Sequence, residues 1–321
     1  MQTGWLSKGG SWYWLDPDSG AMATGWEKAS DGKWYYFEGS GAMRSGGWMK
    51  QGGTWYYLSG SGAMQTGWLS KGGSWYWLDP ESGRMATGWA KAADGKWYYF
   101  EGSGAMRSGG WMKQGSSWYY LSGSGAMQTG WLSKGGSWYW LDPESGRMAT
   151  GWAKAADGKW YYFEGSGAMR SGGWMKQGSS WYYLSGSGAM QTGWLSKGGS
   201  WYWLDPDSGA MATGWERASD GKWYYFEGSG AMQSSRWLKQ GTAWYYLSGS
   251  GAMQTGWLLT GGAWYWMDPE SGMMATGWLE NGGSWYYLDP SSGAMATGTA
   301  VIDGTRYIFD DSGACADFVD E

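Results

Sequence analysis

The sequence contains no histidine and only one cysteine, Cys315. A disulfide within the chain is therefore impossible, and a metal site of cysteine and histidine ligands is excluded. Valine and isoleucine are absent before Val301, although a conventional protein core is built mostly from Leu, Ile and Val. Whatever this chain buries must consist of other side chains.

Two further absences narrow the function. Basic residues are not in excess: the net charge is -5 and the pI is near 4.9, which argues against a nucleic-acid partner. No apolar run approaches the roughly 18 residues that a transmembrane helix needs, and no signal peptide opens the chain. Met1 stands at the repeat position that Met64 occupies later, so we expect an excised or mature piece of a longer protein.

Aromatic residues are present in excess. They make up 20% of the chain and include 33 tryptophans, and glycine contributes 62 residues. A Gly-Trp step recurs from Trp5 onward at intervals of 21, 22 and 20 residues, which add up to a superperiod of 63. Residues 64–126 and 127–189 are identical. This periodicity predicts a repeat array in which each unit contacts its neighbours.

Five positions recur in each repeat. The first tryptophan follows the glycine (Trp5), and the second tryptophan lies seven or eight residues later (Trp12). A third-position ring, Trp or Tyr, lies two residues beyond (Trp14), and a middle tyrosine separates these last two (Tyr13). A methionine follows the next turn, as at Met22. These positions are the candidates for packing and for binding.

Each repeat predicts a β-hairpin. The segment "TGWLS" is a short strand, "GG" or "DGK" forms the turn because glycine accepts positive φ, and "SWYWLD" is the returning strand. A glycine at almost one residue in five nearly excludes helix. Alternation along the strand places Trp12 and Trp14 on one face, and Tyr13 and Leu15 on the other. We interpret the middle tyrosine mainly as a structural residue.

A lone two-stranded hairpin is at best marginally stable in water, so the hairpins are expected to cover one another's aromatic faces. The sequence therefore predicts an all-β solenoid of about fifteen tandem hairpins, with repeats over 1–298 and a degenerate capping repeat over 299–321. Rings from both neighbours would line the grooves between hairpins. Such an aromatic box, with a thioether floor and no lysine inside, suits a quaternary ammonium ion, because ring faces are electronegative and the cation has no hydrogen-bond donor.

The pattern "GW", six or seven residues, "WYY", a turn and "SGAMATGW" resembles the choline-binding repeats of Gram-positive surface proteins, autolysins and phage lysins. The resemblance covers essentially the whole chain. It implies a left-handed superhelical twist with about three hairpins per turn. It also implies an extracellular, non-catalytic module of the bacterial cell wall. This module would bind choline or phosphocholine of teichoic and lipoteichoic acids without a cofactor or a metal.

By this resemblance, each cage combines the first and second tryptophans of one repeat with the third-position ring and the methionine of the next. The predicted cages are Trp5, Trp12, Tyr36 and Met43; Trp26, Trp34, Tyr57 and Met64; Trp48, Trp55, Trp77 and Met85; Trp68, Trp75, Tyr99 and Met106; Trp89, Trp97, Tyr120 and Met127; Trp111, Trp118, Trp140 and Met148; Trp131, Trp138, Tyr162 and Met169; Trp152, Trp160, Tyr183 and Met190; Trp174, Trp181, Trp203 and Met211; Trp194, Trp201, Tyr225 and Met232; Trp215, Trp223, Tyr246 and Met253; Trp237, Trp244, Trp266 and Met274; and Trp257, Trp264, Tyr287 and Met295.

The last repeat departs from the pattern. It replaces the two tryptophans, the third-position ring and the methionine with Thr299, Arg306, Ile308 and Cys315. A cage on Trp278 and Trp285 would therefore lack its third-position ring and its methionine, and we expect it to be weak or empty. We interpret the cysteine as a methionine substitute in a terminal cap rather than as a reactive thiol.

Three alternatives stay open beside this interpretation. Glucan-binding repeats of glucosyltransferases and clostridial toxin repeats share the hairpin and aromatic pattern, although sugars also need polar side chains beside the rings. An enzyme would depend on carboxylates such as Asp16 with Asp18, or Asp79 with Glu81, but these belong to repeated "DP(D/E)SG" turns that hold backbone N–H groups. A repeat spacer without a ligand is the third alternative. The oligomeric state is not predicted.

Overall fold

A computed structural model of the chain describes the backbone of residues 2–319 and the side chains of residues 2–316. Met1, which the sequence aligns with Met64, lies outside the described residues. The described backbone consists of strands and turns and contains no helix. Accordingly, residues 2–319 include no helix that could cross a membrane.

The chain divides into two compact units, which we describe separately. Unit 1 comprises Met1–Gly158 and Tyr162–Met169, and unit 2 comprises Lys159–Tyr161 and Arg170–Glu321. The strands of unit 1 are β1 (Gly4–Lys8), β2 (Ser11–Leu15), β3 (Gly25–Lys28), β4 (Trp34–Phe37), β5 (Gly47–Gln51), β6 (Thr54–Leu58), β7 (Gly67–Lys71), β8 (Ser74–Leu78), β9 (Gly88–Lys91), β10 (Trp97–Phe100), β11 (Gly110–Gln114), β12 (Ser117–Leu121), β13 (Gly130–Lys134), β14 (Ser137–Leu141) and β15 (Gly151–Lys154).

Strand β16 (Trp160–Phe163) contains residues of both units. The strands of unit 2 are β17 (Gly173–Gln177), β18 (Ser180–Leu184), β19 (Gly193–Lys197), β20 (Ser200–Leu204), β21 (Gly214–Arg217), β22 (Trp223–Phe226), β23 (Arg236–Gln240), β24 (Ala243–Leu247), β25 (Gly256–Thr260), β26 (Ala263–Met267), β27 (Gly277–Asn281), β28 (Ser284–Leu288), β29 (Gly298–Ile302), β30 (Thr305–Phe309) and β31 (Cys315–Val319).

Each strand pairs with its neighbour in the chain. Over residues 2–319 the strands form fourteen two-stranded sheets and one three-stranded sheet, the latter from β29, β30 and β31. The prediction of an all-β array of tandem hairpins is therefore confirmed. The handedness of the superhelix and the domain boundary at residue 298 stay predictions.

The turns follow the sequence signals. In the first hairpin Gly9 and Gly10 have φ values of 62° and 80°, the positive values that a tight two-residue hairpin turn requires at both positions. The register pairs Trp5 with Trp14 and places Trp12 opposite Ser7, nearer the turn. The two tryptophans of the returning strand thus lie at different heights along the hairpin.

This difference in height decides which tryptophan is buried. Trp14 is only 2% exposed and belongs to a core cluster with Tyr35 and Phe37 of the next hairpin and Ala63 of the hairpin after that. Trp12, nearer the hairpin turn, is 48% exposed. The core therefore lies where the bases of successive hairpins meet, and the second tryptophan projects beyond it.

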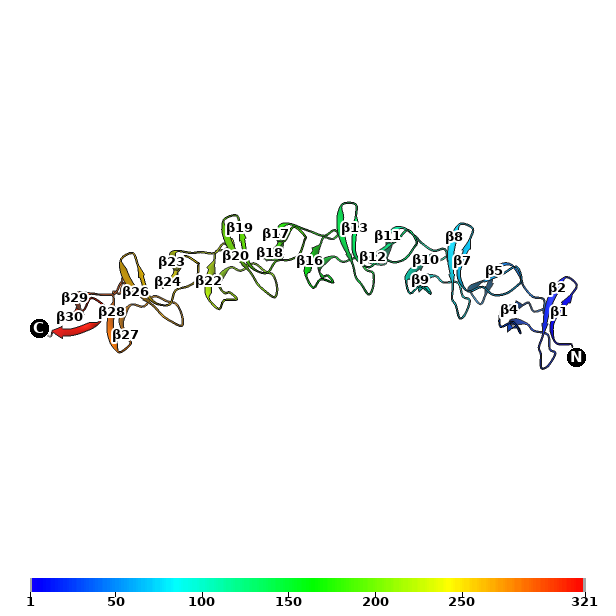
Figure 1. Ribbon diagram of the computed structural model, residues 1–321, viewed down its shortest axis with the longest axis horizontal. Coiled ribbons are helices and arrows are strands. Elements are labelled where there is room, and N and C mark those ends of the chain that lie inside the picture. The colour runs from blue at the N-terminus through cyan, green and yellow to red at the C-terminus, as the bar shows by residue number, and fades with distance from the viewer. Residues whose placement is uncertain (1, 320–321) are drawn as a thin grey trace. The chain divides into compact units, whose positions relative to one another are not determined.

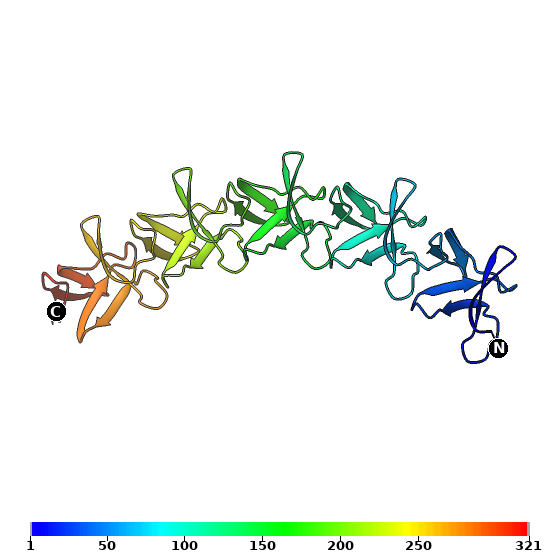
Figure 2. The same ribbon diagram turned by 45° about the vertical axis from the view of Figure 1, so that its right-hand side comes forward.

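Hairpins three apart in sequence have similar orientations within each unit. Figure 1 shows this for β1–β2, β7–β8 and β13–β14 of unit 1, and for β19–β20 and β25–β26 of unit 2. The view in Figure 2 shows the same recurrence. The 63-residue superperiod therefore corresponds to three hairpins.

Candidate functional site

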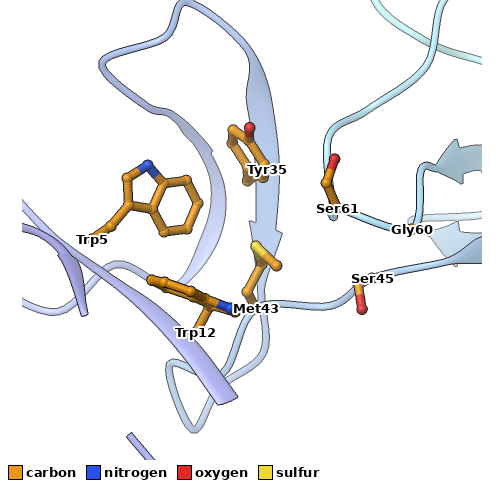
Figure 3. A pocket seen from close by; sticks show the side chains of 7 residues that line it. All are labelled: Trp5, Trp12, Tyr35, Met43, Ser45, Gly60 and Ser61. Atoms are coloured by element: carbon orange, nitrogen blue, oxygen red, sulfur yellow. The ribbon is translucent and has the colours of Figure 1, made fainter. Parts of the chain in front are cut away.

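A pocket opens between the first two hairpins. It has a cavity volume of about 460 Å³ and is lined by the side chains of Trp5, Trp12, Tyr35 and Met43, with Ser45, Gly60 and Ser61 at its rim. Figure 3 shows the three rings and the thioether facing one space, with the rim residues on the opposite side. Three apolar ring walls and a sulfur atom thus surround a cavity that is open to solvent.

The rings are held at steep angles to one another. The centroids of Trp5 and Trp12 lie 6.2 Å apart with an interplanar angle of 88°, and those of Trp5 and Tyr35 lie 4.8 Å apart at 81°. The Tyr35 hydroxyl donates a hydrogen bond of 2.8 Å to Asp31. Burial and this hydrogen bond raise the pKa of Tyr35 to about 12. The phenol therefore stays neutral further into the alkaline range than an ordinary tyrosine does.

The methionine is fixed by backbone contacts. The amide N–H of Met43 donates a hydrogen bond of 2.7 Å to the carbonyl of Trp12 in the preceding hairpin. Behind the side chain, Gly62 has a φ of 87°, and a Cβ added there would lie 2.6 Å from the Met43 methyl carbon. Glycine at this turn therefore leaves the room that the thioether occupies beside the pocket.

The third wall differs from the sequence prediction. The ring that lines the pocket is the middle tyrosine Tyr35 and not the third-position ring Tyr36. Adjacent residues of a strand point to opposite faces, so a shift of one residue exchanges the wall. Tyr36 instead packs against Trp26, its cross-strand partner, with the ring centroids 5.4 Å apart. The middle tyrosine, which we interpreted mainly as a structural residue, therefore also lines the pocket.

The same exchange recurs in both units. The middle tyrosine meets the first tryptophan of the preceding hairpin at centroid distances of 4.8–5.0 Å in the pairs Trp26–Tyr56, Trp48–Tyr76, Trp68–Tyr98, Trp89–Tyr119, Trp111–Tyr139, Trp174–Tyr202, Trp194–Tyr224, Trp215–Tyr245, Trp237–Tyr265 and Trp257–Tyr286.

The remaining predicted third-position rings lie against the first tryptophan of their own hairpin, at 5.1–5.3 Å. They are Tyr57, Trp77, Tyr99, Tyr120, Trp140, Tyr162, Tyr183, Trp203, Tyr225, Tyr246, Trp266 and Tyr287.

The other members of the predicted cages are brought together. Each predicted methionine donates its backbone N–H to the carbonyl of the second tryptophan in its set, in the pairs Met64–Trp34, Met85–Trp55, Met106–Trp75, Met127–Trp97, Met148–Trp118, Met169–Trp138, Met190–Trp160, Met211–Trp181, Met232–Trp201, Met253–Trp223, Met274–Trp244 and Met295–Trp264. Further pockets of this construction lie on Trp26, Trp194, Trp237 and Trp257.

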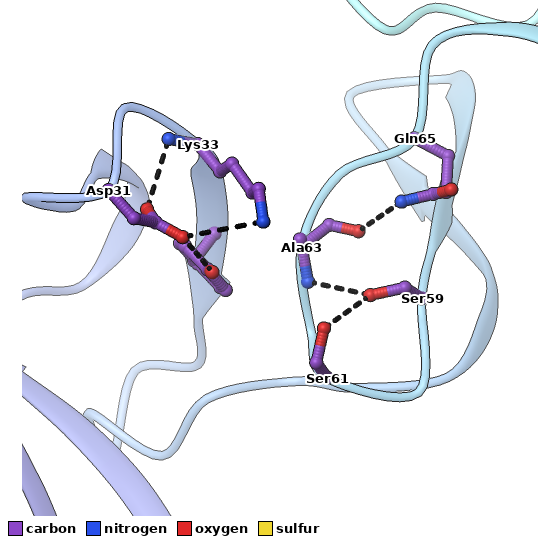
Figure 4. Close-up of polar contacts among 7 residues, drawn as sticks. Asp31, Lys33, Ser59, Ser61, Ala63 and Gln65 are labelled. Carbon is purple, nitrogen blue, oxygen red and sulfur yellow. Dashed lines mark hydrogen bonds and ion pairs between the residues drawn. The ribbon is translucent and has the colours of Figure 1, made fainter.

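A third hairpin completes each pocket, which the sequence prediction missed. Gly60 and Ser61 of the Trp5 pocket rim lie in the turn that follows β6. In this turn the Ser59 and Ser61 hydroxyls lie 2.8 Å apart (Figure 4). The rim of the Trp26 pocket is the turn after β8, with Glu81, Ser82 and Arg84. The only sequence signal for these rims is the composition of the turns, "SGSG" in one and "DPESGR" in the other.

Charged groups distinguish the sites from one another. Arg84 at the rim of the Trp26 pocket has an equivalent in Arg147, whose Nε lies 3.4 Å from the hydroxyl of the middle tyrosine Tyr119. In another subset of hairpins a lysine lies over the second tryptophan, as Lys239 does at 5.4 Å from the Trp244 ring centroid. The lysine ammonium group there is attracted by the same ring that would attract a bound cation, so the two compete.

The acidic turns serve the backbone. Asp16 accepts hydrogen bonds from the Ser19 amide at 2.8 Å and the Ser19 hydroxyl at 2.6 Å, and Asp79 accepts the equivalent bonds from Ser82. The bonds from the serine hydroxyl and amide lower the pKa of each aspartate. These hydrogen bonds agree with the interpretation of Asp16 and Asp79 as turn residues, whereas Glu81 lies at the rim of the Trp26 pocket.

Comparison with family models places these residues in repeats of known type. A model described as the choline-binding repeat matches residues 45–87, 81–111, 108–151, 144–174, 171–215, 234–276 and 261–299. A second model, the putative cell wall binding repeat, matches residues 3–22, 24–43 and 213–232. A search of curated proteins found no match.

Solved structures from Streptococcus pneumoniae are similar to the chain. CbpJ of strain TIGR4 is 31% identical over 84% of this chain and 99% of its own, with a TM-score of 0.48. CbpF, solved in complex with ipratropium, is 29% identical over 99% of both chains, with a TM-score of 0.41. The choline-binding domain of CbpL is 27% identical over 61% of this chain and 100% of its own, with a TM-score of 0.44.

Proposed function

Because the chain belongs to the choline-binding repeat family, we propose that it is a non-catalytic module that binds the quaternary ammonium group of choline and phosphocholine. The single observation that carries this proposal is the pocket of three rings and a thioether between successive hairpins. No carboxylate lines the Trp5 pocket, so the attraction for a cation comes from the ring faces. The quaternary ammonium group has no hydrogen-bond donor, so rings and a thioether suffice as its walls.

The same construction along the chain favours a polymeric ligand. Each cation–π contact contributes roughly 0.5–2 kcal/mol, so three rings give modest affinity at one site. Several sites on one chain gain affinity when the ligand is displayed repeatedly on one polymer. We therefore propose that teichoic and lipoteichoic acids carrying phosphocholine are the partners, and that the module anchors a protein outside the cell at the bacterial cell wall.

A fluorescence titration tests the proposed function. Choline entering the pockets changes the surroundings of two tryptophans per site, so the intrinsic tryptophan emission is expected to change and then saturate at millimolar choline. Glucose oligomers serve as the control for a carbohydrate-binding array. A response to the oligomers with none to choline would overturn the proposal, and a response to neither would favour a spacer.

Replacing Tyr35 by Leu is expected to remove one choline site per chain. Leucine keeps apolar bulk at this buried position but removes the ring face that attracts the cation. The matched control is Tyr36→Leu, which changes the neighbouring ring that packs on Trp26 and should leave the number of sites unchanged. Isothermal titration calorimetry measures the stoichiometry. The assignment of the third wall fails if Tyr36→Leu loses the site and Tyr35→Leu keeps it.

Arginine at the rim is expected to favour phosphocholine over choline. With the ammonium group among the rings, the phosphate of phosphocholine points toward the open rim, where Arg84 can pair with it and Glu81 repels it. The guanidinium group is exposed, so the pairing is worth roughly 0.5–1 kcal/mol, or about two- to fivefold in affinity. The double variant Arg84→Ala with Arg147→Ala should weaken phosphocholine binding at two sites and leave choline binding there unchanged or stronger.

The chain offers a matched control for this variant. Arg44 and Arg107 follow cage methionines but face Glu38 and Glu101, at 3.3 and 3.5 Å. Calorimetric titrations of Arg44→Ala with Arg107→Ala should therefore match the wild type for both ligands. Equal losses of phosphocholine affinity in the two double variants would show a general charge effect and no phosphate contact.

A further inference from the structure

The last sheet contains a ring that the sequence prediction left out of the cages. Because the third wall is the middle tyrosine, the residue that matters after Trp278 is Tyr307 and not Ile308. Tyr307 lies 4.8 Å from Trp278 between ring centroids, whereas Ile308 is 40% exposed. The replacement of the third-position ring therefore removes no wall.

We infer that the rings of Trp278, Trp285 and Tyr307 form an additional site for a quaternary ammonium ion at the last hairpin. This inference rests on the proposed function and reverses the expectation of a weak or empty site. Its third ring, Tyr307, lies beyond position 299, where the match to the choline-binding repeat model ends. The last repeat, although degenerate, would then close one more cage.

The ring geometry matches that of the preceding pocket. Trp278 and Trp285 lie 6.4 Å apart at 78°, and Trp257 and Trp264 of the preceding pocket also lie 6.4 Å apart, at 90°. The distance from the first tryptophan to the middle tyrosine is 4.8 Å in one and 4.9 Å in the other.

The support behind these rings is also present. Phe309 lies 5.9 Å from Trp278, as Phe37 lies 6.0 Å from Trp5 in the first pocket. Trp278 and Trp285 are 38% and 49% exposed, so their rings are open to a ligand from solvent. The walls therefore have the arrangement and the access of the other pockets, but within residues 2–319 no further hairpin follows β30 to form a rim.

Cys315 takes the place of the methionine in this site. It pairs with Phe309 across the last sheet, as Met295 pairs with Leu288 in the preceding hairpin. Strand β31, which begins at Cys315, lies beside β28, which carries Trp285. The thiol is shorter than a thioether side chain, so the cation loses contact with a terminal methyl group but keeps the three rings. We expect a dissociation constant above that of the methionine sites.

The single cysteine makes this site observable apart from all the others. Cys315 is partly exposed, and alkylation of the full-length chain with iodoacetamide reports on this one position. If choline fills the site, it should slow alkylation by the factor 1 + [choline]/Kd, about tenfold when choline is about ten times the dissociation constant. Mass spectrometry of timed samples gives the rate.

Two matched substitutions separate local protection from a general effect of choline. Trp285→Ala removes a wall of the additional site, and Trp264→Ala removes the equivalent wall of the preceding site; both rings are at least 42% exposed, so neither change empties the core. Protection of Cys315 should be lost in Trp285→Ala and kept in Trp264→Ala. Calorimetry should also count one bound choline fewer in Trp285→Ala, which does not depend on thiol reactivity.

The outcomes distinguish this inference from the proposed function. In one outcome, choline saturates the tryptophan emission without slowing the alkylation of Cys315 in the wild type, while Trp285→Ala binds as many choline molecules as the wild type does. This result would disprove the additional site and leave the other sites standing. Protection that persists in Trp285→Ala would also overturn it. If choline changes neither the emission nor the alkylation rate, the proposed function itself fails.

Discussion

Choline at about one hundred times its dissociation constant is expected to raise the free energy of unfolding by about 2.7 kcal/mol for each site. This holds for every site that is lost when its compact unit unfolds. The reason is that each pocket takes walls from two successive hairpins and a rim from a third, so the site exists only while neighbouring hairpins are packed. For a unit of this size, the melting temperature should rise by about 5–10 °C per occupied site. Calorimetric scans at increasing choline concentrations measure the rise.

A neutral control separates the charge from the shape of the ligand. In 3,3-dimethylbutan-1-ol a carbon atom replaces the nitrogen of choline, so the bulk is kept and the positive charge is lost. If the ring faces attract the cation electrostatically, this alcohol should stabilise the chain far less than choline at equal concentration. Equal stabilisation by both compounds would mean that the pockets select apolar bulk, and the cation–π account would be wrong.

Local sequence signals were sufficient for the hairpins. The turn glycines mark positions of positive φ, such as Gly9 and Gly10, and the Trp-Tyr-Tyr segments favour strands. The repeat period also fixes which hairpins are neighbours, and a backbone hydrogen bond joins Met43 to Trp12, two residues that the sequence assigned to one cage.

The third wall could not be obtained in this way. Alternation along a strand assigns Tyr35 and Tyr36 to opposite faces, but it does not tell which face the hairpin turns toward the preceding one. That choice depends on the rotation between successive hairpins, which is a property of tertiary packing. The rim was missed for the same reason, since Ser61 and Arg84 approach the pockets only after a second such rotation.

The sequence pattern also could not predict how deeply each tryptophan is buried. Alternation gives Trp12 and Trp14 one face, yet one is 48% exposed and the other 2%. The difference arises because packing between hairpins covers their bases and leaves the region near the turn uncovered. Residue identity and period cannot reveal this, because both positions are tryptophan in the same strand.

The pair Trp75 and Trp77 in the second copy of this hairpin is expected to divide binding from stability. Trp77 is 4% exposed and packs in a core cluster with Tyr98 and Phe100, so Trp77→Ala should lower the free energy of unfolding by about 3–5 kcal/mol. Trp75 is 49% exposed, and Trp75→Ala should cost less than about 1 kcal/mol. Urea unfolding curves measure both losses.

The number of choline sites should fall in Trp75→Ala, the variant that loses less stability, and stay the same in Trp77→Ala. Trp75→Ala removes a wall from the cage that begins at Trp68, and calorimetry should count one bound choline fewer per chain. Trp77→Ala removes no wall, so the folded variant should keep the full number of sites, with weaker binding only where the loss of core packing shifts Tyr98. Equal losses of stability from the two substitutions, or loss of a site from Trp77→Ala alone, would contradict the division of roles between these two rings. Loss of a site from Trp77→Ala alone would also mean that the third-position ring, and not the middle tyrosine, forms the third wall of a cage.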